Sequence, residues 1–351
     1  MAYSQYDMED EISNFFTKTS ASRLDCDARA EELVGGKATP VVVQGNCSYS
    51  VYAGPCLEYV VQFRLKSLRL DMKIASLARQ LYGSLAPTVS FEGQVGDESK
   101  DKAKDKEPLY AYVMGRMKGV TYLDFILAHD SPDNSPETFA RRQRLMIDMA
   151  RFFALTWKAP QPVDQTYYAK VRETFERDLR MLLEALPVRL HHIIRKCIDS
   201  MDAILSLPMV LLHKDFSACN IIVDEATCHL VGVIDWAEAE ICPFGLNLSS
   251  LQDITGKLHL RNGWTRYDDY DKLQDVFWTT FEDEVGGLAD DCIEAIRLAR
   301  ITGLLLERGF TSRLANEPEP VTIRDDECAR YNMLSLDGFL LHPATRFEGI
   351  D

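Results

Sequence analysis

Long apolar runs are missing from the 351-residue sequence: none approaches the roughly 20 residues that a membrane-spanning helix needs. The first residues, MAYSQYDMEDEISNFF, are acidic and contain neither the basic start nor the apolar stretch of a secretory signal. We therefore expect no transmembrane helix, no membrane partner and no signal peptide.

Paired cysteines are also missing. The nine cysteines are odd in number and scattered, and none belongs to a C-x-x-C pair. Neither a disulfide framework nor a zinc site is indicated. We interpret the cysteines as reduced residues of a cytoplasmic protein.

Positive charge is scarce, with 39 lysines and arginines against 54 aspartates and glutamates and a net charge of −15. Such a chain offers no basic face for a phosphate backbone, which argues against nucleic acid as a partner. The negative charge is compatible with a cationic small substrate, but it is explained equally well as a contribution to solubility alone. No G-x-x-x-x-G-K-[ST] segment exists, which excludes a Walker-type NTPase.

Hydrophobic periodicity predicts an α+β protein with two lobes. Helical spacing is expected at residues 8–36 and 70–83, and strands at residues 40–45, 51–54, 57–64, 87–95 and 109–114. From residue 120 onward the pattern is mainly helical, except for strands at 209–213, 220–224 and 229–236, with helices again after about 246. We therefore expect three parts: a helical segment at 1–36, a small β-rich lobe at 37–117, and a larger, mainly helical lobe at 118–351.

The stretch LLHKDFSACNIIV interrupts two apolar runs with polar residues. If the runs around Asn220 and Asp235 pair as an antiparallel hairpin, these two side chains lie at the same end of it, and Asp215 lies on the preceding loop. Amide and carboxylate oxygens are ligands that suit Mg²⁺, which leaves Asp215 to accept a proton. Taken singly, each residue is also explained as a solvated turn residue.

HKDFSACN followed by VIDW resembles the aminoglycoside phosphotransferase and choline kinase family. The resemblance implies a protein-kinase-like fold, ATP and Mg²⁺ as cofactors, and a small-molecule acceptor with a hydroxyl or amine. It implies Asp215 as catalytic base, His213 as a structural brace, and Asn220 and Asp235 as metal ligands. Trp236 stands where protein kinases have Phe-Gly, which disfavours a protein kinase.

The small lobe departs from the family pattern. No G-x-G-x-x-G is present, so the resemblance assigns the phosphates to the turn after the first strand, although a plain hairpin explains this turn equally well. The residues in question are Gly45, Asn46, Ser48 and Tyr49. Gln62 stands where a phosphate-binding cation is expected, and Arg64 on the same strand face could supply the charge. Ile74 stands where the family has the glutamate that pairs with this cation.

By the same resemblance, Met114 and Met117 would border adenine, unless they only pack between the lobes. Glu238 and Glu240 would face the acceptor and could bind a cationic group, unless they belong to an ordinary charged loop. HKDFSACN and YVVQFR also resemble fungal members of the family, which would fit a natural product as acceptor. The alternative function is a catalytically silent kinase-like module that binds a ligand or a protein, as Gln62 and Ile74 suggest.

Overall fold

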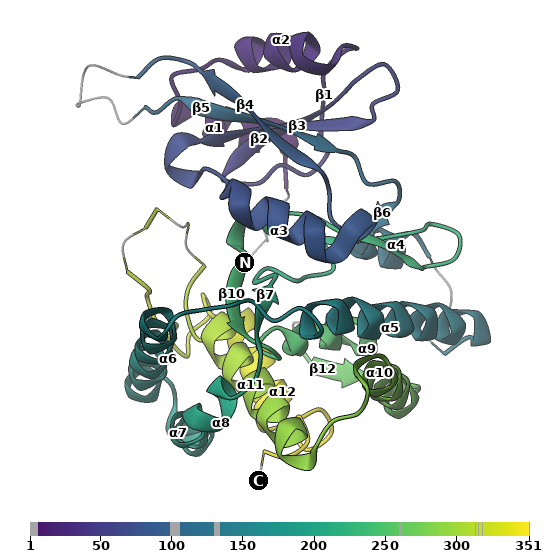
Figure 1. Cartoon of the computed structure of the whole chain (residues 1–351), viewed down its shortest axis with the longest axis vertical. Coiled ribbons are helices and arrows are strands. Elements are labelled where there is room, and N and C mark those ends of the chain that lie inside the picture. The colour runs from purple at the N-terminus through teal and green to yellow at the C-terminus, as the bar shows by residue number, and fades with distance from the viewer. Residues whose placement is uncertain are drawn as a thin grey trace. The chain divides into compact units, whose positions relative to one another are not determined.

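A computed structural model describes residues 6–98, 106–129, 134–259, 261–312, 314, 316–317 and 319–350. The chain divides into two compact units (Figure 1). The first unit comprises Met1–Lys118 with Leu314–Pro318, and the second comprises Gly119–Arg313 with Glu319–Asp351. None of the helices in the described ranges is both long and apolar enough to cross a membrane.

The first unit contains an antiparallel sheet with the strand order β1-β2-β3-β5-β4. Its strands are β1 (Thr39–Pro40), β2 (Ser48–Ala53), β3 (Tyr59–Leu65), β4 (Val89–Val95) and β5 (Leu109–Gly115). The apolar runs predicted as strands at 57–64 and 109–114 are confirmed as β3 and β5, which pair along their whole length.

In the described part of this unit, the sheet is accompanied by the helices α1 (Met8–Thr17), α2 (Arg23–Val34) and α3 (Met72–Tyr82). The segment expected to be helical at 8–36 is two helices, because Ser22 starts the second one with a capping box to Asp25. One sheet face and the first two helices share a core that includes Phe15, Cys26, Val61 and Phe63. The hydrophobic side of the sheet is thus covered by α1 and α2.

The other sheet face is more polar. Side chains alternate along a strand, so Gln62 and Arg64 point away from the core residues Val61 and Phe63. Gln62 lies opposite Tyr112, whose hydroxyl accepts a hydrogen bond from the main-chain nitrogen of Leu70, just before α3. This polar face carries the residues to which the family resemblance assigns the phosphate-binding charge.

The prediction of a strand at residues 40–45 is wrong, because β1 ends at Pro40. Val42 and Val43 are 73% and 69% exposed, so these apolar residues do not enter the core. The Gln44 side chain instead donates to the carbonyl oxygens of Val41 and Ser50 and accepts from the Ser50 nitrogen. A glutamine side chain thus makes the hydrogen bonds that a longer first strand would have made, and the second strand begins at Ser48.

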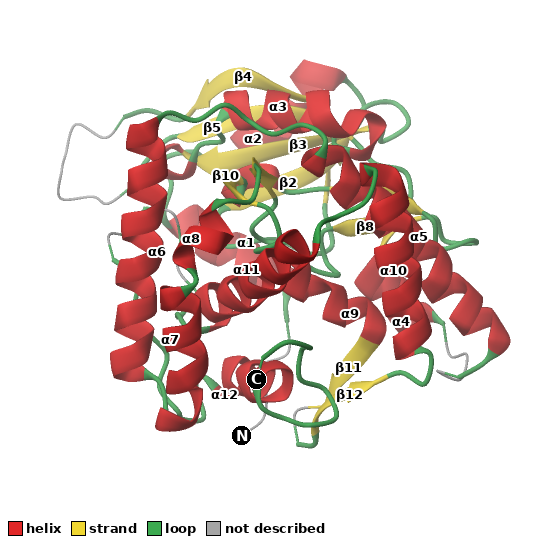
Figure 2. Ribbon diagram, turned by 60° about the horizontal axis from the view of Figure 1, so that its bottom comes forward, coloured by secondary structure: helices red, strands yellow, loops and turns green. Residues whose placement is uncertain are grey.

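The second unit is mainly helical (Figure 2). Helix α5 begins at Pro136 and is capped by Ser135, whose hydroxyl accepts a hydrogen bond from the Thr138 nitrogen. It packs along α10 through aromatic residues such as Phe153 and Phe277. The helices are α4 (Tyr122–Ala128), α5 (Pro136–Trp157), α6 (Gln165–Ala185), α7 (His191–Asp199), α8 (Met201–Leu205), α9 (Gln252–Thr255), α10 (Tyr270–Val285), α11 (Asp290–Arg308) and α12 (Arg330–Leu340).

Short strands position the polar motif within this unit. They are β6 (Val120–Thr121), β7 (Met209–Leu212), β8 (Ile221–Val223), β9 (Leu230–Val233), β10 (Glu240–Pro243), β11 (Gly256–His259) and β12 (Gly263–Arg266). The predicted hairpin is confirmed as β8–β9, with β6 added at the edge of β8. Strand β7 pairs with β10, a partner that the sequence did not indicate.

The expectation of helices alone after residue 246 is wrong for residues 256–266, which form the β11–β12 hairpin. Gly263 has a φ of 77°, which lets the chain turn where a larger residue would be strained. Trp264 then packs against Phe339 of α12, with ring centroids 4.6 Å apart. The fold as a whole confirms the predicted α+β class, with a small β-rich unit and a larger, mainly helical one.

Candidate active site

His213 lies at the end of β7 and is 2% exposed. Its Nε2 lies 2.7 Å from the carbonyl oxygen of Ile234, and because a carbonyl can only accept, Nε2 carries the proton. Burial lowers the pKa of His213, which keeps the ring neutral. The histidine thereby ties the start of the loop to the end of β9.

Asp215 and Asn220 meet directly within the loop. The Asn220 Nδ2 donates to the main-chain oxygen of Asp215 over 2.8 Å and to its carboxylate Oδ2 over 2.9 Å. The Asp215 side chain remains accessible, yet the surrounding protein desolvates it and raises its pKa, while His213 and Asn220 act in the opposite direction. The asparagine fixes the carboxylate at the surface of the unit.

Asp235 follows β9 in an unusual backbone conformation. Its φ and ψ are 60° and 66°, a left-handed geometry that costs energy for any residue with a side chain. The buried Trp236, whose indole nitrogen donates to the Val233 oxygen over 2.9 Å, holds the turn in place. Strain of this kind, kept by packing, is often found at functional positions.

Asn220 and Asp235 lie at the same end of the hairpin, as predicted. Ile221 pairs with Val233, and the Ile234 nitrogen donates to the Asn220 oxygen over 2.9 Å. Since both N–H groups of the Asn220 amide face Asp215, its Oδ1 is directed elsewhere and takes no hydrogen bond within the described residues. One amide oxygen and one carboxylate fit the oxygen chemistry of Mg²⁺.

The loop between these residues is anchored by packing. Phe216 is 5% exposed and contacts the rings of Phe152 and Phe153 from α5, at 5.6 and 5.4 Å between centroids. The Ala218 oxygen accepts from the Leu123 nitrogen at the start of α4. A rigid support on two helices therefore carries the polar residues.

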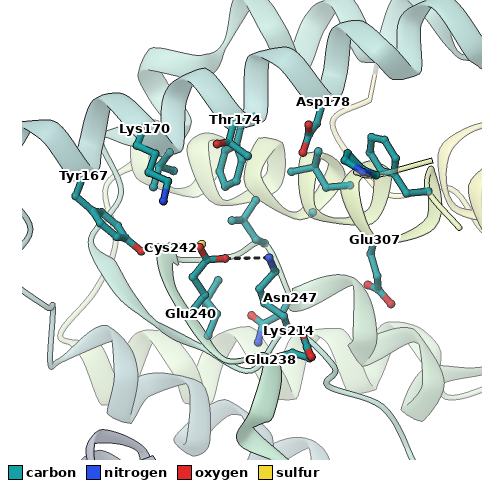
Figure 3. Close-up of a pocket in the computed structure, with 18 of the residues that line it drawn as sticks. Tyr167, Lys170, Thr174, Asp178, Lys214, Glu238, Glu240, Cys242, Asn247 and Glu307 are labelled. Atoms are coloured by element: carbon teal, nitrogen blue, oxygen red, sulfur yellow. Dashed lines mark hydrogen bonds and ion pairs between the residues drawn. The ribbon is translucent and has the colours of Figure 1, made fainter. Parts of the chain in front are cut away.

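A cavity of about 330 Å³ lies next to this loop, and Lys214 is one of its lining residues. We call it the acceptor cavity; α6, β10 and α11 contribute to its wall. Figure 3 shows side chains of α6 on one side and those of the motif region on the other: Tyr167, Lys170, Thr174 and Asp178 face Lys214, Glu238, Glu240 and Asn247.

Acidic groups outnumber basic ones in the acceptor cavity. Its carboxylates are Asp178, Glu238, Glu240 and Glu307, against the amines of Lys170 and Lys214. Glu240 is paired with Lys214, at 2.9 Å between Oε2 and Nζ. Glu238 forms no ion pair or side-chain hydrogen bond within the described part of the chain. Both glutamates named from the sequence thus line one cavity, but one of them is already neutralised.

Sequence reasoning missed the α6 and α11 residues of this cavity. Tyr167, Lys170 and Asp178 lie on an amphipathic helix without a motif, and Glu307 lies far along the chain on α11. Burial raises the pKa of Glu307, and the negative charges of Asp253 and Asp215 add to this. Lys214 could have been singled out, because it lies between His213 and Asp215 in the motif.

The predicted phosphate-binding residues of the first unit fall into two groups. Gly45 and Asn46 lie in the loop before β2, whereas Ser48 and Tyr49 belong to the strand itself. Tyr49 is 1% exposed, stacks on Phe63, and donates its hydroxyl to Asp27. Because a strand alternates its faces, Tyr49 points into the core, which argues against its predicted contact with phosphate.

Gln62 and Arg64 form a chain of hydrogen bonds on the polar face. Arg64 donates from Nη1 to the Gln62 Oε1 over 3.3 Å and from Nε to the Leu68 oxygen over 2.8 Å. Gln62 Nε2 donates in turn to the Ser50 hydroxyl over 3.3 Å. Within the described residues Arg64 has no carboxylate partner, in line with Ile74 in the place of a glutamate.

Met114 and Met117 lie at and after the end of β5. Met114 pairs with Val60 and Val89 in the sheet. The main-chain nitrogens of Gly115 and Arg116 are already bound to the oxygens of Thr88 and Glu58. Neither of these N–H groups is therefore free for adenine, and the contact of Met114 and Met117 with adenine stays a prediction.

Comparison with solved structures gives the class of the fold. A candidate aminoglycoside phosphotransferase from Ralstonia eutropha is 14% identical over 90% of this chain and 96% of that one, with a TM-score of 0.52. The ethanolamine kinase of Plasmodium vivax is 11% identical, with 96% and 95% covered and a TM-score of 0.46. A choline/ethanolamine kinase family protein from Mesorhizobium loti is 13% identical, with 80% and 83% covered and a TM-score of 0.46. The first of these similarities identifies a two-lobed, protein-kinase-like fold.

The family follows from the sequence itself. Residues 52–275, well over half of the chain, match the model of the phosphotransferase enzyme family, APH. The chain belongs to this family, and it is therefore a kinase of small molecules. No curated protein sequence matches it significantly.

Proposed function

We propose that the protein transfers the γ-phosphate of ATP to a hydroxyl or amine of a small molecule bound in the acceptor cavity. One observation carries this proposal: Asp215 is held by Asn220 immediately beside Lys214, which lines the cavity. A carboxylate at this place can orient an acceptor group and receive its proton.

The reaction balances with these groups. The acceptor oxygen or nitrogen forms a bond to the γ-phosphorus, and the bond from that phosphorus to the oxygen bridging to the β-phosphate breaks. The proton of the acceptor passes to Asp215, and the electron pair leaves with ADP. Positioning and charge neutralisation contribute most of the rate in such a transfer.

Asn220 and Asp235 would hold Mg²⁺ when nucleotide is present. The ion would neutralise phosphate oxygens during transfer. The Asn220 amide N–H groups are bound to Asp215, so the amide oxygen would be available to coordinate the ion. Asp235 contributes the negative charge from a turn that packing keeps in its left-handed conformation.

Arg64 would replace the usual phosphate-binding cation, with Gln62 positioning it through the hydrogen bond to Nη1. Gly45, Asn46 and Ser48 would approach the phosphates, and Met114 and Met117 would border adenine. Arg64→Met should then raise the KM for ATP about tenfold, since a charge-assisted hydrogen bond is lost. Arg64→Lys keeps the charge and should raise the KM for ATP by less. Equal KM values in the unchanged protein and in both variants would show that Arg64 does not belong to the nucleotide site.

The acceptor would be a cationic small molecule, such as an amine-bearing natural product. Glu238 favours this, because it is the lining carboxylate that forms no ion pair within the described residues. The other three, Asp178, Glu240 and Glu307, pair with Arg177, Lys214 and Arg308. The apolar rings of Tyr167, Phe175 and Phe310 would pack against its carbon skeleton. A cytoplasmic location and the absence of nucleic-acid partners stay predictions.

The decisive experiment measures ADP production with a panel of hydroxylated and aminated compounds. Asp215→Ala should lower kcat by about 10²- to 10⁴-fold with any accepted compound, because general-base catalysis contributes on that scale. Glu225→Gln, in the exposed turn at the opposite end of the hairpin, is the matched control and should keep full activity. Full turnover by Asp215→Ala would exclude this residue as the base.

The same assay, together with a binding measurement, distinguishes a kinase from the alternative, a catalytically silent kinase-like module. A protein that turns over none of the compounds and does not bind Mg²⁺ and nucleotide by calorimetry is a ligand-binding module. Binding of Mg²⁺ and nucleotide without turnover points instead to an acceptor outside the panel, and the panel is then extended with amine-bearing natural products.

A further inference from the structure

A second cavity, of about 260 Å³, lies in the same unit, among α10, α11 and the chain around Phe347. It shares no lining residue with the acceptor cavity. Its volume is somewhat below the ~300 Å³ at which pockets for drug-sized ligands begin, so only a small molecule fits. We call it the Arg300 cavity.

Arg300 is the unusual residue of this cavity. It is 9% exposed, and its Nε and Nη2 atoms are buried without a hydrogen-bond partner in the described chain. Its guanidinium carbon lies 3.8 Å from the ring centroid of Phe347, and no carboxylate within the described ranges forms an ion pair with it. Tyr270 is a hydrogen-bonding neighbour of the guanidinium, so the unpartnered donors of Arg300 in the described chain are Nε and Nη2. Buried charged donors without a partner are costly, and proteins normally give them an anionic partner.

Two neighbouring residues also favour the binding of an anion, one as a hydrogen-bond donor and one as a positive charge. Gln274 lines the same cavity, and its buried Nε2 has no hydrogen-bond partner among the described residues. Arg266, stacked on Tyr270 at 3.7 Å, places a second positive charge nearby. Burial lowers the pKa of Arg300 to about 10, and Arg266 adds to the lowering while Tyr270 and Glu348 oppose it.

We propose that the Arg300 cavity binds a small organic monocarboxylate, whose two oxygens accept hydrogen bonds from Arg300 and Gln274. A guanidinium fork matches a carboxylate in a bidentate geometry. Trp278, Ile293 and Phe347 form apolar walls for a flat carbon skeleton.

The carboxylates at the same cavity restrict the charge of the ligand. Asp275, Glu282 and Glu348 belong to its lining. They would repel a dianion such as phosphate more strongly than a monoanion, because the repulsion grows with charge. A monocarboxylate with an apolar body therefore fits better than inorganic phosphate.

Calorimetric titration of the whole protein tests this inference with three probes: benzoate, the neutral analogue benzamide, and inorganic phosphate. We expect benzoate to bind at millimolar concentration, and benzamide and phosphate to bind at least about tenfold more weakly, as loss of a charge-assisted hydrogen bond implies. Benzoate should also raise the melting temperature, since a ligand that binds the folded state stabilises it.

The variant Arg300→Met should abolish benzoate binding, and Gln274→Met should weaken it several-fold while keeping the fold. Arg180→Met, an exposed arginine of α6, is the matched control and should bind as the unchanged protein does. If Arg300→Met does not fold, Gln274→Met decides the question. The inference is overturned if benzoate fails to bind, if benzamide binds equally well, or if these cavity variants bind like the control; ordered water would then satisfy the buried donors.

Discussion

The side-chain nitrogen of Asn220 donates to both the main-chain oxygen and the carboxylate of Asp215, over 2.8 and 2.9 Å. One amide therefore sets the position of the proposed base and, through its own orientation, the direction of the oxygen offered to a cation. The two functions proposed for the site would therefore be coupled by a single side chain.

Asn220→Ala should consequently impair both functions. We expect the stabilisation of the protein by ATP with Mg²⁺ to shrink to that given by ATP alone, because an oxygen ligand is lost. Thermal melting with and without Mg²⁺ measures this without any acceptor. Glu225→Gln should show the full difference, and a full difference in Asn220→Ala as well would contradict the assignment.

Glu238 and Glu240 should differ in their effect on a cationic acceptor. Glu240 is neutralised by Lys214, so Glu238→Gln should raise the acceptor KM by about tenfold and Glu240→Gln by less. Lys214→Met releases Glu240 and should lower the KM. The test is steady-state kinetics at low and high salt, and equal KM values in both glutamine variants would show that the ion pair does not matter.

Asp253 on α9 should make stability depend on pH. Burial raises its pKa from 3.8 to about 6, with Arg308 opposing the shift. The folded protein thus binds this proton more tightly than the unfolded chain, so the stabilisation is complete below 3.8 and is lost as the pH rises through about 6. The free energy of unfolding of Asp253→Asn, relative to the unchanged protein, should increase between about pH 4 and pH 7. A difference that stays constant in urea titrations across this range would refute the prediction.

The ion pair between Arg142 of α5 and Asp269 before α10 is nearly inaccessible, with side chains 5% and 6% exposed. Asp269→Asn leaves the guanidinium beside a neutral amide and should lower the free energy of unfolding by about 3–5 kcal/mol. Glu284→Gln, which breaks the exposed pair with Lys158, should cost at most about 1 kcal/mol. Denaturant unfolding compares the two, and similar losses would mean that burial of the pair is unimportant.

The motif residues of the second unit could be predicted because they depend on local geometry. Residues Asn220 and Asp235 flank one hairpin, and strand pairing alone brings them to the same end. The left-handed conformation of Asp235 left no trace in the sequence, because aspartate there is compatible with an ordinary turn as well.

The first unit was harder to predict for a specific reason. The run PVVVQG is apolar enough for a strand, but the Gln44 side chain takes over the hydrogen bonds that such a strand would make. Strand β2 starts at Ser48, three residues before the expected start at residue 51, so Tyr49 belongs to a strand and points into the core instead of lying in a turn. Likewise, no local pattern could show that residues of α6 and α11 share a cavity with Lys214, because only tertiary packing unites them.

Gly303 of α11 borders the acceptor cavity, and a Cβ atom at this position would overlap the carbonyl oxygen of Leu246. Any larger residue would push back the segment that carries Asn247. For protein engineering, this makes the α11 wall a poor place to alter substrate preference. The side chains of α6 that face the cavity, such as Thr174 and Lys170, are the positions where selection for a new acceptor could begin.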